Sequence, residues 1–150
     1  VAYALLTAGV RELDLVDTDS ARCAARAAEL AGFFPDQLVT ARTTAELPQL
    51  MPLADGLVHC TPVGMAAHPG LPLDMSLVDA RHWVADIVYR PIETQLIREA
   101  RAKGCDVLDG GRMAVGQAAD AFRIFTGLEA DAERMRTHFL ELVAAEEVAA

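Results

Sequence analysis

The feature that most constrains this chain is a regular alternation between segments with a strand pattern and segments with a helix pattern. Strand patterns, short and rich in valine and leucine, occupy residues 12–17, 37–43, 55–61, 82–89 and 105–110. Helix patterns occupy residues 1–7, 18–32, 44–51, 91–104, 112–127 and 131–148. Short connections and apolar strands predict a parallel sheet covered by helices on both faces. We therefore expect an α/β fold, a Rossmann-like doubly wound parallel sheet.

Capping residues predict where two of these helices begin and end. The first helix after a strand begins at Asp19 or Ser20, whose side chains accept hydrogen bonds from free backbone N–H groups, and Gly32 is placed to end it. The helix that follows the fourth strand pattern begins at Pro91, which suits a first helical turn, and Gly104 comes after its end.

The charge balance argues against one class of partner. The 150 residues contain 13 Lys and Arg against 22 Asp and Glu, a net charge of -9. Proteins that bind a phosphate backbone need clustered positive charge, and no basic stripe is present. The longest apolar run, over residues 1–10, is too short to cross a bilayer. We expect neither a nucleic-acid partner nor membrane association.

The cysteines and histidines favour no metal site or disulfide framework. Cys23, Cys60 and Cys105 lie far apart without a C-x-x-C pair, and no histidine has metal-ligand spacing to them. Free thiols are typical of a reducing compartment, so we expect a cytoplasmic protein.

The sequence begins at Val1, already inside a helix pattern. In a Rossmann order the Gly-rich phosphate loop comes just before the first helix, and this sequence does not include it. We expect residues 1–150 to be a partial NAD(P)-binding domain, followed by C-terminal helices, that lacks the first strand and this loop. Neighbours of a missing central strand would have unpaired backbone groups, which predicts poor stability of the isolated chain.

The carboxyl ends of the strands are the expected ligand site of such a sheet, which points to the loops after residues 16, 60, 88 and 108. Asp17 follows the first strand, where an acidic side chain accepts hydrogen bonds from the adenosine ribose and repels a 2'-phosphate. Alternatively, Asp17 and Asp19 cap the next helix and pair with Arg22. Both interpretations stay open on this pattern alone.

Three motifs follow in order: CTPVGM at 60–65, DIVYRPIETQLIREARAKGC at 86–105 and DGGRMAVGQAADAFRIFTG at 109–127. Together they resemble the C-terminal, cofactor-binding domain of the shikimate dehydrogenase family. Asp17 with Asp19 and Arg22, together with AAHPG, HWVADIVYRPIET and FTGLEADAERMR, further resembles the NAD-dependent quinate/shikimate dehydrogenases. This resemblance implies that Asp17, Asp19 and Arg22 bind the cofactor. The Asn-Arg-Thr type motif typical of the NADP-dependent biosynthetic enzymes is absent from the second strand.

The resemblance places the CTPVGM loop against the dinucleotide. Thr61, Val63 and Gly64 would then bind cofactor, and Gly64 would allow close backbone approach because it has no β-carbon. A loop that faces a cofactor needs little charge of its own. His59 stands where the family usually has asparagine; we assign it no catalytic role and expect a core histidine.

The resemblance also assigns residues of the later motifs. Val88 would pack on the nicotinamide, and the Tyr89 hydroxyl would reach the carboxylate or a ring hydroxyl of the substrate. Gly110 would lie beneath the nicotinamide and Met113 would contact the cofactor. Gln117, one turn after Met113 on the same helical face, would bind substrate hydroxyls, for which an amide that donates and accepts is suited. The alternative for Tyr89 is a tyrosine that only packs at a strand edge.

The implied reaction is reversible hydride transfer from a ring carbinol of quinate or shikimate to NAD. In the family a lysine and an aspartate of an N-terminal catalytic domain move the proton. That domain is absent from this chain, so we assign no catalytic residue and expect no activity from the 150 residues alone. A homodimer is among the expected assemblies.

Two other functions stay open. The first is an NADP-dependent shikimate or aminoshikimate dehydrogenase, in which Arg22 would bind the 2'-phosphate against the opposing charge of Asp17. The second is a dinucleotide-binding module without catalysis. If the full protein contains the lysine and aspartate of the N-terminal catalytic domain, the non-catalytic module is excluded.

Overall fold

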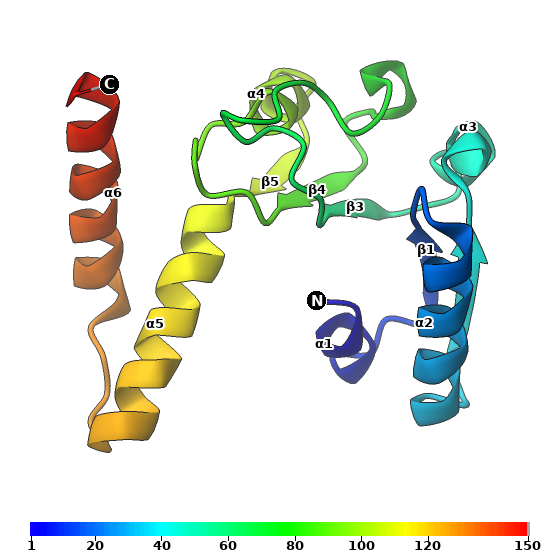
Figure 1. Ribbon diagram of the computed structural model, residues 1–150, viewed down its shortest axis with the longest axis horizontal. Helices are drawn as coiled ribbons and strands as arrows, with labels where there is room; N and C mark the ends of the chain where they lie inside the picture. Colours follow the sequence, from blue (N-terminus) through cyan, green and yellow to red (C-terminus); the bar gives the residue numbers. More distant parts are fainter. Residues whose placement is uncertain (150) are drawn as a thin grey trace. The chain divides into compact units, whose positions relative to one another are not determined.

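The computed structural model describes residues 1–149, and side chains through residue 145. The chain divides into two compact units, Val1–Leu53 and Ala54–Ala150 (Figure 1). Each unit contains its own parallel sheet, and the two sheets share no ladder among the described residues. The predicted α/β class with parallel strands is confirmed, although the strands do not form one continuous sheet.

The first unit is a small parallel sheet packed against one long helix. Its strands pair in parallel with Leu13 beside Val39. The long helix buries Cys23, Ala27 and Leu30, which are spaced so that one helical face meets the sheet. The elements of this unit are α1 (Ala2–Thr7), β1 (Glu12–Val16), α2 (Ser20–Phe33), β2 (Leu38–Arg42), η1 (Thr44–Glu46) and α3 (Leu47–Leu50).

The ends of α2 test the predicted caps. Asp19 is the N-cap, and its Oδ1 accepts a hydrogen bond of 3.0 Å from the backbone N–H of Arg22. The predicted end at Gly32 is wrong, because α2 continues to Phe33 and closes with the Phe34 N–H bonded to the Leu30 carbonyl. Gly32 keeps a negative φ, so it does not supply the left-handed turn that ends a helix at glycine.

The second unit is a parallel sheet of order β3-β4-β5 with helices after it. Helix α4 packs on β4 and β5, and α5 packs along α6 (Figure 1). Val84 in β4 and Ile97 in α4 are fully buried at the centre of this packing. The elements are β3 (Gly56–His59), η2 (Met75–Leu77), β4 (Trp83–Asp86), α4 (Gln95–Ala102), β5 (Asp106–Leu108), α5 (Gly110–Thr126) and α6 (Ala132–Ala149).

The start of α4 differs from the prediction. The helix begins at Gln95 rather than at Pro91, because Thr94 is the N-cap and its hydroxyl accepts a hydrogen bond of 3.2 Å from the Ile97 N–H. Pro91 lies in the loop that precedes the cap. Strand β4 also ends at Asp86, so the residues after it belong to that loop.

Candidate functional site

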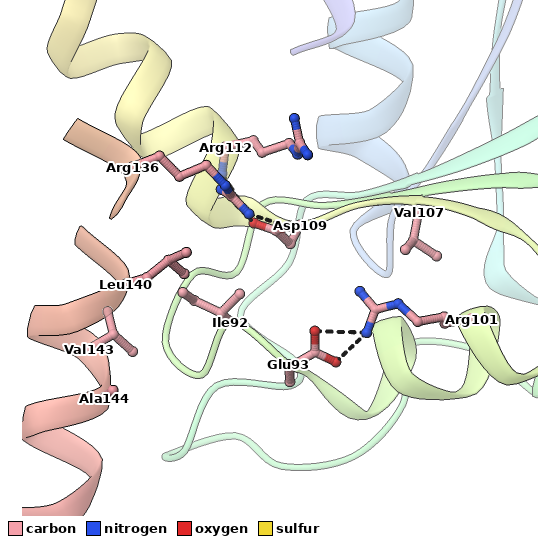
Figure 2. A pocket seen from close by; sticks show the side chains of 10 residues that line it. All are labelled: Ile92, Glu93, Arg101, Val107, Asp109, Arg112, Arg136, Leu140, Val143 and Ala144. Carbon is pink, nitrogen blue, oxygen red and sulfur yellow. Dashed lines mark hydrogen bonds and ion pairs between the residues drawn. The ribbon is translucent and has the colours of Figure 1, made fainter. Parts of the chain in front are cut away.

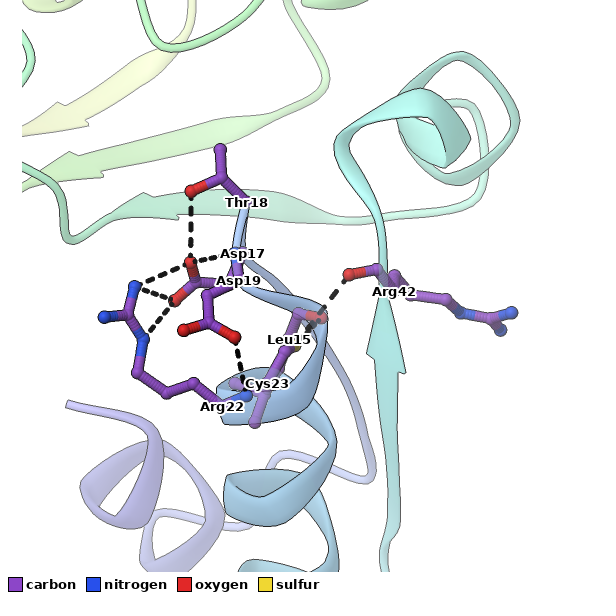
Figure 3. Close-up of polar contacts among 7 residues, drawn as sticks. All are labelled: Leu15, Asp17, Thr18, Asp19, Arg22, Cys23 and Arg42. Atoms are coloured by element: carbon purple, nitrogen blue, oxygen red, sulfur yellow. Dashed lines mark hydrogen bonds and ion pairs between the residues drawn. The ribbon is translucent and has the colours of Figure 1, made fainter.

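The end of β1 forms an exposed charged cluster (Figure 3). The Arg22 guanidinium donates to both carboxylate oxygens of Asp17, with Nη2 at 2.8 Å from Oδ1 and Nε at 3.2 Å from Oδ2. The backbone N–H of Asp19 donates to Asp17 as well, at 3.0 Å. The capping and pairing contacts of the alternative interpretation are therefore both present, with Asp19 as the cap and Asp17 as the partner of Arg22.

Electrostatics at this cluster keep Asp17 ionised. The hydrogen bonds from Arg22 and from the Asp19 N–H lower the pKa of Asp17 to about 2. The two side chains remain accessible, with exposed fractions of 32% for Asp17 and 67% for Arg22. Surface ion pairs of this kind contribute little to stability, so they can rearrange around a ligand. The cluster offers a carboxylate to hydroxyl donors and a guanidinium to anions.

The loop after β3 is a tight turn. The Gly64 N–H donates to the His68 carbonyl at 2.7 Å, and the His68 N–H donates to the Met65 carbonyl at 2.9 Å. Gly64 has φ +96°, and an added β-carbon would meet Thr94. The turn thus requires glycine for its backbone conformation, which residues with a side chain rarely adopt.

Beneath this loop lies a buried polar network that joins the ends of β3 and β4. His59 and Asp86 are register partners in the two strands, and His59 Nδ1 lies 3.0 Å from Asp86 Oδ1. His59 Nε2 lies 2.5 Å from the hydroxyl of Thr61. The other oxygen of Asp86 accepts from the Thr94 hydroxyl at 2.7 Å. His59, Asp86 and Thr94 are all buried.

The protonation state of Asp86 follows from this network. Burial opposes its negative charge, but donors from His59, the Val88 N–H and the Thr94 hydroxyl together outweigh burial and lower the pKa of Asp86. An ionised carboxylate only accepts hydrogen bonds, and here each contact supplies a donor. Asp86 is therefore a charged, fully bonded anchor for the loops around it.

A largely apolar cavity of about 330 Å³ opens beside this network. Of the predicted site residues it brings together Thr61, Val88 and Tyr89, from the loops after β3 and β4. Val88 is buried, whereas Tyr89 keeps 45% of its surface exposed. The remaining lining residues are Cys60, Pro62, Met65, Ile87 and Arg90. Such a cavity can accept a flat ring and leave the phenol hydroxyl available for a polar group.

The predicted residues of α5 lie outside the lining of this cavity. Gly110 is the first residue of α5, and an added β-carbon would lie 2.3 Å from the Val88 carbonyl oxygen. That close approach explains the glycine and ties α5 to the β4 loop. Met113 is half-buried and Gln117 is exposed on the same helix. The structure does not bring Gln117 into the cavity beside Tyr89.

A second cavity, of about 480 Å³, lies between the α4, β5, α5 and α6 segments and contains no predicted site residue (Figure 2). Two ion pairs line it: Arg136 to Asp109 at 3.0 Å and Arg101 to Glu93 at 2.7 Å. Arg112 lines the same cavity as a third guanidinium. Both carboxylates already have an arginine partner, and we assign the cavity no ligand.

Sequence reasoning missed the roles of His59, Asp86 and Thr94. A partial signal was present, because His59 and Asp86 are polar residues within two successive strand patterns, 55–61 and 82–89. Side chains that end neighbouring parallel strands lie at the same edge of the sheet, so the pair could have been proposed.

The described residues hold no cluster of His, Cys, Asp or Glu arranged to bind a metal ion. None of their helices is both long enough and apolar enough to cross a membrane.

Comparison with known proteins finds similarity along the whole chain. The family described as Shikimate 5'-dehydrogenase C-terminal domain matches residues 111–138. A shikimate dehydrogenase (NADP(+)) of Arthrobacter sp. (strain FB24) is 89% identical over 150 residues, which is 100% of this chain and 51% of that protein. A quinate/shikimate dehydrogenase (NAD(+)) of Corynebacterium efficiens is 50% identical over 142 residues, which is 95% of this chain and 50% of that protein.

Among solved structures, the quinate dehydrogenase from Corynebacterium glutamicum in complex with NAD is similar with a TM-score of 0.89 and 48% identity. The match covers 94% of this chain and 50% of that one. The chain thus spans about half the length of the relatives it matches. These relatives differ in the dinucleotide that their names give.

Proposed function

Because this chain belongs to the shikimate dehydrogenase family, we propose that it is the cofactor-binding part of a dehydrogenase that oxidises quinate or shikimate. A bound dinucleotide would supply the hydride acceptor for the ring carbinol carbon, which would become a ketone. The proton of that hydroxyl leaves to a base, for which the family resemblance points to residues outside this chain. The part played here is binding and orientation.

The residues present fit a nicotinamide dinucleotide. The cavity beside Thr61 and Val88 is mostly apolar and opens to solvent, as a flat ring site requires. Gly64, at φ +96° in the loop beside that cavity, adopts a backbone conformation that glycine allows. Tyr89 is the residue we propose for the substrate, because its exposed phenol can donate one directed hydrogen bond.

The choice of NAD over NADP rests on the end of β1. Asp17 is ionised and exposed, so it can accept from ribose hydroxyls. A 2'-phosphate in the same place would face this carboxylate, and two like charges at contact distance repel. The Arg22 guanidinium already binds both oxygens of Asp17, so it would have to leave its partner to hold a phosphate. We therefore propose NAD as the cofactor.

The alternative is NADP, and one observation favours it. Two thirds of the Arg22 side chain is exposed, so it can turn toward an anion, and the 89% identical Arthrobacter relative is named for NADP(+). In that case Arg22 would pair with the 2'-phosphate.

A full-length hybrid tests the function. In this hybrid the chain replaces the matching 150 residues of the Arthrobacter relative. We expect the hybrid to reduce a nicotinamide dinucleotide with quinate or shikimate, and the 150-residue chain alone to show no turnover. The unmodified relative, assayed in parallel, serves as the positive control. A folded hybrid that reduces neither NAD nor NADP with either substrate would contradict the proposal.

A further inference from the structure

A chain of hydrogen bonds connects the interior of the second unit to the surface of the loop after β3. It passes from Asp86 through His59 to Thr61, with 3.0 Å between the first pair of atoms and 2.5 Å between the second. The imidazole and the carboxylate have exposed fractions of 3% and 0%, whereas Thr61 is exposed and lines the apolar cavity. The network thus ends at a hydroxyl that a ligand can reach.

The donors and acceptors along this chain are fixed by Asp86. Its two oxygens also receive the Val88 N–H at 3.0 Å and the Thr94 hydroxyl at 2.7 Å. Since an ionised carboxylate cannot donate, His59 must hold its proton on Nδ1. In the neutral imidazole Nε2 is then an acceptor, and the Thr61 hydroxyl must donate to it.

This direction leaves both lone pairs of the Thr61 oxygen able to accept hydrogen bonds. The Val63 N–H donates to that oxygen at 3.3 Å, a long contact that uses one lone pair and leaves the second for another donor. The hydroxyl hydrogen itself is committed to His59. Thr61 can therefore accept a hydrogen bond from a ligand but cannot donate one.

We propose that His59 is a positioning residue that, together with Asp86, fixes Thr61 as an acceptor for a hydroxyl or amide N–H of the dinucleotide. The inference rests on the proposed function, because the ligand is the cofactor named there. It also gives His59 a role that a merely packed core histidine would not have.

The sharpest variant is His59→Asn. An asparagine amide reaches the position of Nδ1 and can still donate to Asp86, but it is too short to replace Nε2. His59→Asn therefore keeps the buried carboxylate partnered while Thr61 loses its acceptor. His68→Asn is the matched control, because the same change is made on an exposed side chain of the same loop.

Affinity for NAD in the hybrid, measured by isothermal titration calorimetry, provides the first test. We expect His59→Asn and Thr61→Val each to weaken NAD binding about 2- to 10-fold, the range of one net hydrogen bond. The double variant should bind no more weakly than either single one, because both changes remove the same interaction. His68→Asn should match the wild type, and His59→Asn should keep the wild-type melting temperature within a few degrees.

An analogue of NAD distinguishes the two groups that could donate to Thr61, the carboxamide N–H and a ribose hydroxyl. Nicotinic acid adenine dinucleotide has a carboxylate in place of the carboxamide, so it lacks that N–H. If His59→Asn and Thr61→Val no longer weaken binding of this analogue, the donor to Thr61 is the carboxamide N–H. If both variants still weaken its binding, the donor is a ribose hydroxyl.

The imidazole tautomer provides a test that needs no cofactor. Long-range ¹H–¹⁵N spectra of the hybrid, compared with those of His59→Asn, identify the His59 ring, and we expect its proton on Nδ1. A proton on Nε2, or equal NAD affinity of wild type and His59→Asn, would overturn the inference alone. Absence of any dinucleotide binding by the wild-type hybrid would instead overturn the proposed function, and with it the ligand assigned here.

Discussion

The carboxyl ends of β1 and β4 both carry an aspartate with a lowered pKa, but in opposite settings. Asp17 at β1 is accessible and paired with an exposed arginine, Arg22. Asp86 at β4 has no exposed side-chain surface and is bound by a histidine, a backbone N–H and a hydroxyl. The first arrangement can exchange its partner for a ligand, whereas the second cannot. We infer that the β1 end selects the cofactor and the β4 end holds the loops in place.

Truncation of Asp86 should have the largest effect. Asp86→Ala leaves His59 and Thr94 without their partner inside the protein, and breaking a buried charged pair costs about 3–5 kcal/mol. Trp83, the one tryptophan of the sequence, lies in β4 and reports unfolding of this unit by fluorescence in urea. Asp17→Ala, at an exposed pair of the first unit, should leave the urea midpoint unchanged when far-ultraviolet circular dichroism, which reports both units, follows the unfolding. Equal urea midpoints for the two variants would contradict the proposed difference between the exposed Asp17 pair and the buried Asp86 network.

Gly110→Ala should come next. The new β-carbon would overlap the Val88 carbonyl oxygen, so the β4 loop or α5 must shift, at about 1–3 kcal/mol for overpacking. Gly116→Ala on the same helix is the control, because no atom lies within 4 Å of an added β-carbon there. That change should stabilise the chain by up to about 1 kcal/mol through helix propensity. Urea unfolding measures both, and a neutral Gly110→Ala would mean that the close approach is unimportant.

The pH dependence of stability should carry the signature of Asp86. Its folded pKa is lowered, so its contribution is complete above the unfolded value of about 3.9 and is lost as pH falls through the folded pKa. The melting temperature of the second unit should therefore drop below about pH 4. Asp86→Asn should be less stable at pH 7 and should show a smaller drop on acidification. If the melting temperature of Asp86→Asn fell with pH as steeply as that of the wild type, the fall would come from other carboxylates.

The smallest effect on stability, and the largest on selectivity, is expected at Asp17. Asp17→Asn keeps the size of the side chain but removes the charge that opposes a 2'-phosphate, so the hybrid should gain affinity for NADP relative to NAD by about tenfold. Arg26→Gln serves as a control for the loss of a surface charge, because Arg26 lies on the exposed side of α2 in an ion pair with Glu29. An unchanged ratio in Asp17→Asn would mean that another group selects the cofactor.

Local signals predicted much of the fold. Asp19, one of the two residues predicted as the cap of α2, is the N-cap, and a cap can be predicted because its effect depends only on the next few residues. The start at Pro91 failed for the opposite reason, since Thr94 is fixed as the cap partly through its bond to Asp86, a partner that only the folded strand supplies. Gly32 failed because a glycine in a helix pattern does not reveal its φ.

The candidate site divides in the same way. Asp17 and the turn at Gly64 could be placed from strand ends and a loop motif, and both lie where those signals put them. The link from His59 to Asp86 depends on the register of β3 against β4, which the sequence does not give directly. The relation of Gln117 to the cavity depends on how α5 lies after its close contact at Gly110, which is tertiary information.

The most direct test of the central claim is the initial rate of reduction of NAD against NADP by the hybrid, with quinate and with shikimate. We predict a strong preference for NAD that Asp17→Asn diminishes, because the charge of Asp17 faces the adenosine ribose. A preference for NADP in the wild-type hybrid would contradict this account and would assign the end of β1 to Arg22 and a 2'-phosphate.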